Sequence, residues 1–131
     1  MFLDASAIVA IIAQEPDAAD LAARLSGATE AHTSPIAIYE AAAALGRIGR
    51  VPAAATLALI DALLRDCNAV VTPITPAIGL SAIAAFDRYG KGRHRAALNL
   101  GDCFAYACTR ALNTELLCKG DDFGHTDAVL A

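Results

Sequence analysis

Several features that would place a sequence in a large class at once are missing here. The 131 residues include no tryptophan, nine glycines and five prolines, and sparse glycine and proline argue against a disordered chain. No apolar run approaches the roughly 20 residues of a membrane-spanning helix. Acids and prolines interrupt the longest runs, at Asp4, Glu40, Pro73 and Pro76. The N-terminal segment has no basic region, so we expect no secretory signal and a cytoplasmic protein.

The patterns of structural zinc sites and of nucleophilic enzymes are also absent. The four cysteines form no C-x-x-C pair, and the three histidines do not complete a zinc pattern. No Ser-His-Asp or Cys-His set and no glycine-rich phosphate loop is apparent. We therefore interpret the cysteines as small buried thiols.

Excess basic charge is missing too, since the formal net charge is −4. This argues against a protein that coats nucleic acid with a basic surface. It does not exclude an enzyme that acts on nucleic acid, because a cluster of carboxylates lowers the net charge while a bound metal ion restores positive charge locally.

What the chain does contain is an alternation of short apolar segments with alanine-rich, helix-like stretches. The expected strands are 2–3, 30–33, 69–72 and 115–118, and the expected helices are 7–13, 17–25, 34–49, 53–67, 78–89 and 101–111. Strands separated by helices pair in parallel, with helices on both faces of the sheet. Length and pattern predict one α/β domain over residues 1–131.

Four acidic positions stand out against this expected sheet. Asp4 and Asp121 both follow strands, so a parallel sheet places them at one edge, where ligands bind. Glu40 lies about two turns into the helix that begins at Ser34-Pro35. Asp102 begins the helix before the last strand, and spacing alone leaves its distance from this edge open. Carboxylates that meet raise one another's pKa unless a cation lies among them, and Mg²⁺ or Mn²⁺ suits an all-oxygen site.

Each acid also has an ordinary structural explanation. Asp4 and Asp102 are placed to cap helices, and Glu40 is placed to be a solvated helix residue. Asp121 and Asp122 fit a turn after the last strand. Only the set of acids together favours a functional site.

In its order of motifs the sequence resembles the PIN-domain ribonucleases, specifically the VapC toxins of toxin–antitoxin pairs. The resemblance rests on residues 1–7 (MFLDASA), Ser34-Pro35 leading to Tyr39-Glu40, residues 98–107 (LNLGDCFAYA), and residues 116–123 (LLCKGDDF) with Thr126-Asp127. These stretches span nearly the whole chain in the family's order.

The resemblance implies a three-layer α/β/α PIN fold with a short, mainly parallel central sheet. It also implies that one or two Mg²⁺ ions, with Mn²⁺ as a substitute, lie among the catalytic acids Asp4, Glu40, Asp102 and Asp121. Asp4 and Asp102 would be the direct metal ligands. Ser6 would support the site, as would Asp122 by capping the next segment, and Asp121 is preferred to Asp122 as the fourth acid. Many relatives carry threonine at position 5, where this chain has Ala5.

The implied activity is that of an endoribonuclease toxin of a type II toxin–antitoxin system. Glu40 or Asp121 would orient or deprotonate the attacking water. Arg93 and Arg95, in a basic loop before Asp102, would contact phosphates of the RNA substrate. The resemblance further implies a VapB-type antitoxin as partner and a homodimer.

Two other functions fit parts of the sequence. A catalytically silent PIN-like module that only binds a partner protein would keep the fold without the metal site. A receiver domain accepts phosphate on an acid at its sheet edge, but such domains place their adjacent acid pair after the first strand. Here the adjacent pair, Asp121-Asp122, follows the last one.

Overall fold

Four short parallel strands form the centre of the computed structural model, which describes residues 1–131. The strands are β1 (Phe2–Leu3), β2 (His32–Thr33), β3 (Val70–Val71) and β4 (Leu116–Leu117). They pair in the order β3-β2-β1-β4, and all three pairings are parallel. The carboxyl ends of all four strands therefore lie at one edge of the sheet. All four expected strands are confirmed, but the three expected at 30–33, 69–72 and 115–118 are each only two residues long.

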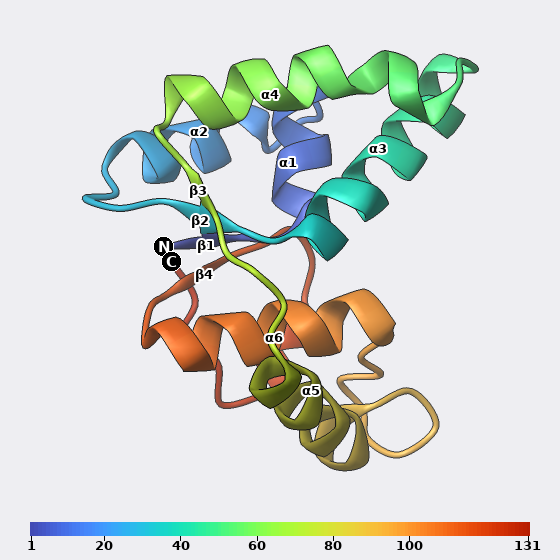
Figure 1. Cartoon of the computed structure of the whole chain (residues 1–131), viewed down its shortest axis with the longest axis vertical. Coiled ribbons are helices and arrows are strands. Elements are labelled where there is room, and N and C mark those ends of the chain that lie inside the picture. Colours follow the sequence, from blue (N-terminus) through green and yellow to red (C-terminus); the bar gives the residue numbers. More distant parts are fainter.

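Helices cover both faces of this sheet. They are α1 (Ala5–Ile12), α2 (Ala18–Ser26), α3 (Pro35–Gly49), α4 (Leu57–Asp66), α5 (Pro76–Tyr89) and α6 (Leu100–Leu112), with short 3₁₀ turns η1 (Ala53–Thr56) and η2 (Asp122–His125). Figure 1 shows α1 to α4 above the sheet and α5 and α6 below it. The segment that contains β3 leads from the upper layer to the lower one. The expected three-layer α/β/α arrangement is confirmed.

The two residues of β1 and the two residues of β4 divide the core between the layers. Leu3 and Leu117 pack into the cluster formed with α1 to α4, whereas Phe2 and Leu116 pack into the cluster formed with α5 and α6. Successive side chains of a strand point to opposite faces, so even a two-residue strand serves both layers. All four side chains are almost completely buried. Each such burial contributes about 1.5–3 kcal/mol to folding.

The predicted start of α3 is confirmed in its capping geometry. The Ser34 hydroxyl accepts a hydrogen bond from the Ala37 backbone N–H at 3.1 Å, and Pro35 takes the first helical position. A serine cap satisfies one of the free N–H groups, and proline there lacks only an N–H that the helix would leave unpaired. This start sets the position of Glu40 relative to the sheet edge.

The expectation of buried thiols holds for two of the four cysteines. All four thiols are free, and Cys103 and Cys108 are buried while Cys67 and Cys118 are partly exposed. Burial raises the pKa of the Cys108 thiol to about 11.

No single helix is both long and apolar enough to cross a membrane. The pair α3 and Ala53–Asp66 reaches that length and composition only jointly, across a bend of 101°.

Candidate active site

Asp4 lies at the carboxyl end of β1 and both caps a helix and faces a cleft. Its side chain is 4% exposed. One oxygen, Oδ2, accepts hydrogen bonds from the backbone N–H and the hydroxyl of Ser6, at 2.9 and 2.5 Å. The Ser6 hydroxyl oxygen also accepts a hydrogen bond from the Lys119 backbone N–H at 2.9 Å. Ser6 therefore ties the end of β4 to the Asp4 carboxylate and leaves Oδ1 of Asp4 without a hydrogen bond.

Asp102 lies inside the first turn of α6 and is not its N-cap, which corrects the sequence prediction. The cap is Asn99, whose side chain accepts a hydrogen bond from the Asp102 N–H at 3.0 Å. The Asp102 carboxylate in turn accepts one from the Asn99 N–H at 2.8 Å. This reciprocal pair is a capping box, which fixes the rotamer of the aspartate.

The direction of α6 brings Asp102 to the acidic edge. Only residues 113–115 separate the end of α6 from β4. The helix therefore runs back against the direction of the strand, and its start lies near the edge where β4 ends. The charge of Asp4 acts on Asp102 in the folded protein. The sequence left open whether Asp102 reaches the edge where Asp4 lies, and the short connection between α6 and β4 brings it there.

Glu40 reaches the same place from α3, and Gly101 makes room for it. The Glu40 carboxyl group lies so close to the Gly101 backbone that a Cβ at position 101 would overlap it. Both carboxyl oxygens and Cδ would be involved, so the end of the Glu40 side chain would have to move away if position 101 carried a Cβ. Glycine is therefore needed at this position for its small size, and not for backbone freedom.

Burial and neighbouring negative charges raise the pKa of two of these acids, Glu40 and Asp102. Burial, together with the charges of Asp4 and Asp102, raises the pKa of Glu40 from its ordinary value of 4.5 to about 7. Burial, with the charges of Asp4 and Asp122, raises the pKa of Asp102 to about 6, against a lowering by the hydrogen bond from Asn99. Such mutual repulsion at a partly desolvated site is relieved by a cation.

A cleft of about 430 Å³ contains these acids. It is lined by Asp4, Ala5, Ser6, Val9, Glu15, Glu40, Ala44, Arg47, Asn99, Asp102 and Lys119. The Lys119 ammonium group is engaged with Glu15 and lies 3.5 Å from Asp17. Four acidic side chains and two basic ones thus face this space.

The donor groups of the cleft fit a hard divalent cation. No three or more His, Cys, Asp or Glu side chains stand ready to hold one metal ion. A cage of that kind suits zinc, whereas Mg²⁺ is bound by one or two carboxylates, several waters and substrate phosphate. Asp4 and Asp102 provide two carboxylates of that type, each held in place by hydrogen bonds to a neighbouring residue.

The adjacent acids after β4 lie differently from the sequence preference. Asp121 is exposed, does not line the cleft and precedes η2, where its backbone carbonyl accepts a hydrogen bond from Gly124 at 3.0 Å. Asp122 is also exposed, but its charge contributes to the raised pKa of Asp102. Neither acid lines the cleft, and of the pair only Asp122 has a charge that acts on Asp102.

The two arginines of the basic loop lie outside the cleft. Arg93 has its guanidinium group 3.4 Å from Asp87 and 5.0 Å from the centre of the Phe86 ring. Arg95 is exposed, and neither arginine lines the space that contains the acids. The structure thus gathers Asp4, Ser6, Glu40 and Asp102 in one cleft, and the cleft lining does not include Asp121, Asp122, Arg93 or Arg95.

Sequence reasoning missed four contributors to this cleft: Asn99, Gly101, Arg47 and the Lys119 backbone. The first had a readable signal, since Asn99 followed three residues later by Asp102 is a capping-box pattern. Arg47 follows Glu40 by seven residues, which is two helical turns, so a helix places both on one face. The roles of Gly101 and of the Lys119 N–H depend on contacts between distant segments, and no local pattern signals them.

Comparisons with known proteins agree with this geometry. The family model of the PIN domain matches residues 1–129. A VapC ribonuclease of Rhizobium meliloti (strain 1021) is 39% identical, over 96% of this chain and 97% of that protein. Ribonuclease VapC36 of Mycobacterium tuberculosis (strain H37Rv) is 40% identical, over 97% of this chain and 90% of its own length.

A solved structure extends the agreement to the fold. The crystal structure of Mycobacterium tuberculosis VapC20, described as a sarcin–ricin loop cleaving toxin, has a TM-score of 0.77 and 20% sequence identity, and covers 99% of this chain and 97% of that one. An identity this low speaks for the fold only. From the matched residues and the curated relatives, the chain belongs to the PIN-domain family, among the VapC ribonucleases.

Proposed function

We propose that this chain is a metal-dependent endoribonuclease that acts as the toxin of a type II toxin–antitoxin system, with Mg²⁺ as its cofactor and Mn²⁺ as a substitute. One observation carries the proposal: Asp4, Glu40 and Asp102 come from three separate elements and interact electrostatically in one cleft. The relatives named above support RNA as the substrate. The whole of residues 1–131 would form the one PIN domain.

The residues of the cleft divide the work of phosphodiester hydrolysis. Asp4 and Asp102 would hold the cation, and Ser6 and Asn99 orient these carboxylates by hydrogen bonds. When bound, the cation would supply a water of lowered pKa and offset the charge that builds on the phosphate. Glu40, on the wall of the same cleft, would take the proton of the attacking water.

Asparagine substitutions in the acid pair after β4 test the fourth acid. Since the charge of Asp122 acts on Asp102, we expect Asp122→Asn to lower cleavage about tenfold and Asp121→Asn to change it less than twofold. The measurement is the initial rate of RNA cleavage at fixed Mg²⁺ for both proteins. The reverse order of effects would restore Asp121 as the fourth acid, as the sequence resemblance implies.

A methyl group at Gly101 is expected to lower activity without unfolding the protein. In Gly101→Ala, the Glu40 carboxyl group must leave its position, and a misplaced proton acceptor costs about 10²-fold in rate. Gly79→Ala is the matched control, because Gly79 is also helical and a Cβ there meets nothing within 4 Å. Equal cleavage rates for the two variants would show that the Glu40 position is unimportant.

The proposed function itself is tested in cells. Brief expression of the chain alone should stop growth and produce new RNA 5′ ends at defined sites, and sequencing of 5′ ends measures this. Expression of Asp102→Asn is the control, and it should produce neither effect. A wild-type protein that generates no new 5′ ends, and that binds no Mn²⁺ in a titration, would instead be the catalytically silent binding module.

Partners and location follow from the same proposal. A VapB-type antitoxin would cover the cleft, and growth arrest should be relieved when it is co-expressed. The toxin would be a cytoplasmic homodimer, so light scattering should give twice the chain mass of 13.5 kDa. A mass of one chain at micromolar concentration would contradict the dimer.

A further inference from the structure

Arg47 is a free cation on the wall of an otherwise acidic cleft. Two helical turns separate it from Glu40 along α3, and both residues line the same space, with Ala44 between them. No carboxylate lies within 4 Å of its guanidinium group, and it makes no side-chain hydrogen bond. Lys119, the other cation of the cleft, is already held by Glu15. Arg47 is therefore the cleft cation that is free to meet an anion.

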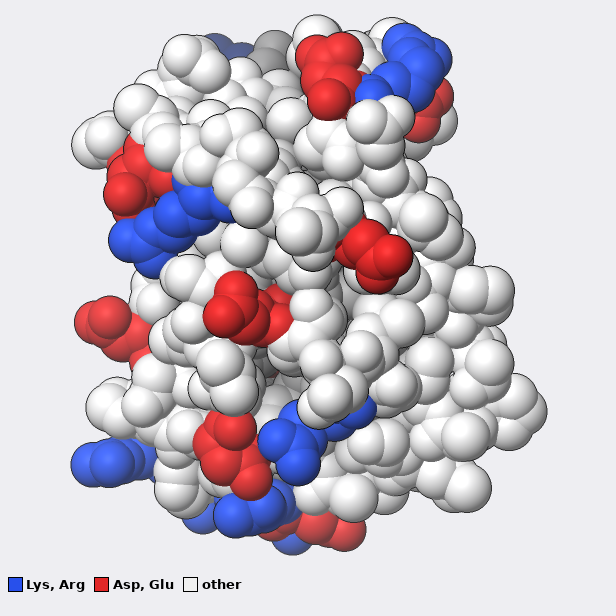
Figure 2. All heavy atoms as spheres, turned by 90° about the vertical axis from the view of Figure 1, so that its left-hand side faces the viewer, with Lys and Arg blue, Asp and Glu red and all other residues white.

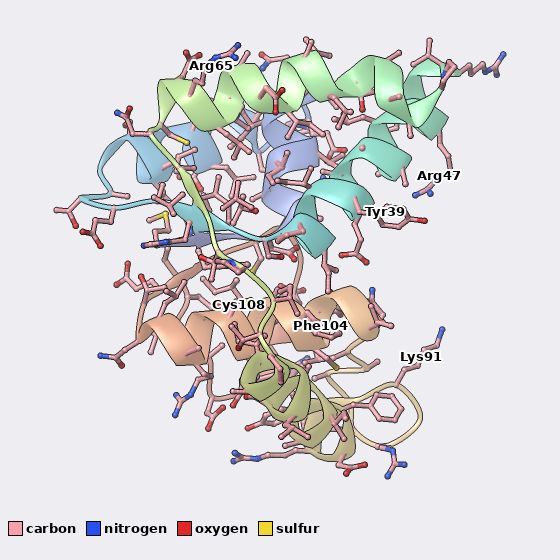
Figure 3. The ribbon with its side chains drawn as sticks, in the orientation of Figure 1. Tyr39, Arg47, Arg65, Lys91, Phe104 and Cys108 are labelled. Atoms are coloured by element: carbon pink, nitrogen blue, oxygen red, sulfur yellow. The ribbon has the colours of Figure 1, made fainter.

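Tyr39 gives α3 an exposed aromatic ring about two turns before this cation. The side chain is 73% exposed, makes no hydrogen bond, and immediately precedes Glu40 in the helix. Figure 3 shows that Tyr39 and Arg47 project from α3 toward the same side of the molecule, the side to which Lys91 also projects from the loop before α6. A cation on the wall of the cleft and an exposed ring on the same side of the molecule are the kinds of group that hold single-stranded nucleic acid, through phosphate and base respectively.

The opposite side of the molecule has no comparable surface. Figure 2 shows that side, with basic and acidic side chains in small separate groups among uncharged atoms. A broad basic footprint is thus missing there, and the net charge of −4 is consistent with few phosphate contacts.

We propose that Arg47 and Tyr39 form the nucleotide-binding rim of the active site, a step that rests on the proposed ribonuclease function. Arg47 binds an RNA phosphate that flanks the one attacked at Asp4 and Asp102. Tyr39 stacks on a neighbouring base and thereby sets which nucleotide lies beside the cut. In this arrangement α3 contributes both the proton acceptor, Glu40, and the substrate contacts on its outer turns.

The other function open to Arg47 is structural. It lies in the last turn of α3, where a cation stabilises the helix dipole by about 0.3–1 kcal/mol. That role needs no particular donor geometry and does not affect RNA. The two functions therefore differ in what a substitution changes.

The test measures cleavage kinetics and cut-site preference on a randomised single-stranded RNA library, with sequencing of the new 5′ ends. In Arg47→Gln we expect KM to rise on the order of tenfold with kcat within about twofold, because the lost contact is the same in the ground and transition states. The slope of log KM against the logarithm of the salt concentration should also become smaller by about 0.7, because one phosphate contact on a single strand contributes about that much to the slope. Arg65→Gln is the matched control: Arg65 is an exposed arginine of α4, without an ion pair, away from the cleft.

The tyrosine is tested by a pair of substitutions. Tyr39→Leu should flatten the base preference at one position beside the cut and raise KM on the order of tenfold, since one base–aromatic stack is lost. Tyr39→Phe keeps the ring and should retain both the preference and KM. Anisotropy of a labelled library in the cleavage-deficient Asp102→Asn background gives a second readout that needs no turnover.

The outcomes distinguish a failure of the proposed rim from a failure of the proposed ribonuclease function. If the wild type cleaves RNA but Arg47→Gln and Tyr39→Leu match Arg65→Gln in KM, salt slope and base preference, the rim is refuted while the ribonuclease stands. A loss of thermal stability in Arg47→Gln with unchanged KM assigns the arginine to the helix end and also refutes it. A wild type that cleaves no RNA overturns the proposed function and the rim together.

Discussion

Asp4→Asn and Asp102→Asn proteins are each expected to cleave RNA about 10³-fold more slowly than the wild type while remaining folded. Each substitution removes one of the two charges that would hold the cation, and the cation supplies several kcal/mol of transition-state stabilisation. Asparagine keeps the local structure, since it also accepts hydrogen bonds at a helix cap. Its carbonyl oxygen can replace the carboxylate oxygen that accepts from Ser6 or Asn99.

The measurement is single-turnover cleavage in Mg²⁺, with circular dichroism to establish folding. Asp61→Asn is the control, because Asp61 is an exposed α4 aspartate without an ion pair. Calorimetric titration with Mn²⁺ should show weaker binding for Asp4→Asn and Asp102→Asn and unchanged binding for the control. Wild-type cleavage by both site variants would remove the two carboxylates from the mechanism and leave the fold without an assigned metal site.

Glu40→Gln is expected to inactivate the protein and, in EDTA, to stabilise it. Burial and the neighbouring acids raise the pKa of Glu40 to about 7, so the folded state holds this proton more tightly than the unfolded state does. The stability contributed by the group is therefore complete below pH 4.5 and is lost as the pH rises through 7. At pH 8 the ionised carboxyl group penalises folding, and glutamine removes the penalty.

The expected gain at pH 8 is about 1 kcal/mol in the free energy of unfolding, since water screens this half-exposed group and reduces the effect. At pH 4 the wild type and the variant should be equally stable. Urea unfolding at the two pH values in EDTA measures both numbers, and Glu115→Gln, at an exposed position without an ion pair, controls for the amide. Equal stabilities at pH 8 would mean that the carboxylate is not strained in the metal-free cleft.

Such a gain would come with a loss of cleavage of about 10²–10⁴-fold, the usual contribution of a general base. Glu40 would then lower the stability of the metal-free protein while it raises the activity, a trade-off that is common at active sites. This trade-off would also account for the position of Glu40, whose carboxyl group lies against the Gly101 backbone where a Cβ would overlap it.

The sequence by itself determined the architecture and the identity of most of the acids. Short strand-like segments, the Ser34-Pro35 helix start and helix-like stretches between strands specify a parallel α/β/α sandwich, because these signals are local. Parallel pairing then carries Asp4 to the ligand-binding edge whatever the details of packing. The order of the motifs was enough to indicate the family, since each motif follows from the chain alone.

Only the tertiary structure decided how the cleft is assembled. That Asp102 meets Asp4 depends on the short link between α6 and β4, and that Glu40 fits depends on Gly101, which approaches it from another helix. The turn after β4 leaves both Asp121 and Asp122 outside the cleft lining, although the charge of Asp122 acts on Asp102, and packing leaves Arg47, not Arg93, on the wall of the cleft. These are contacts between segments far apart in the chain, so they follow from how the layers pack, and no local pattern of residues specifies them.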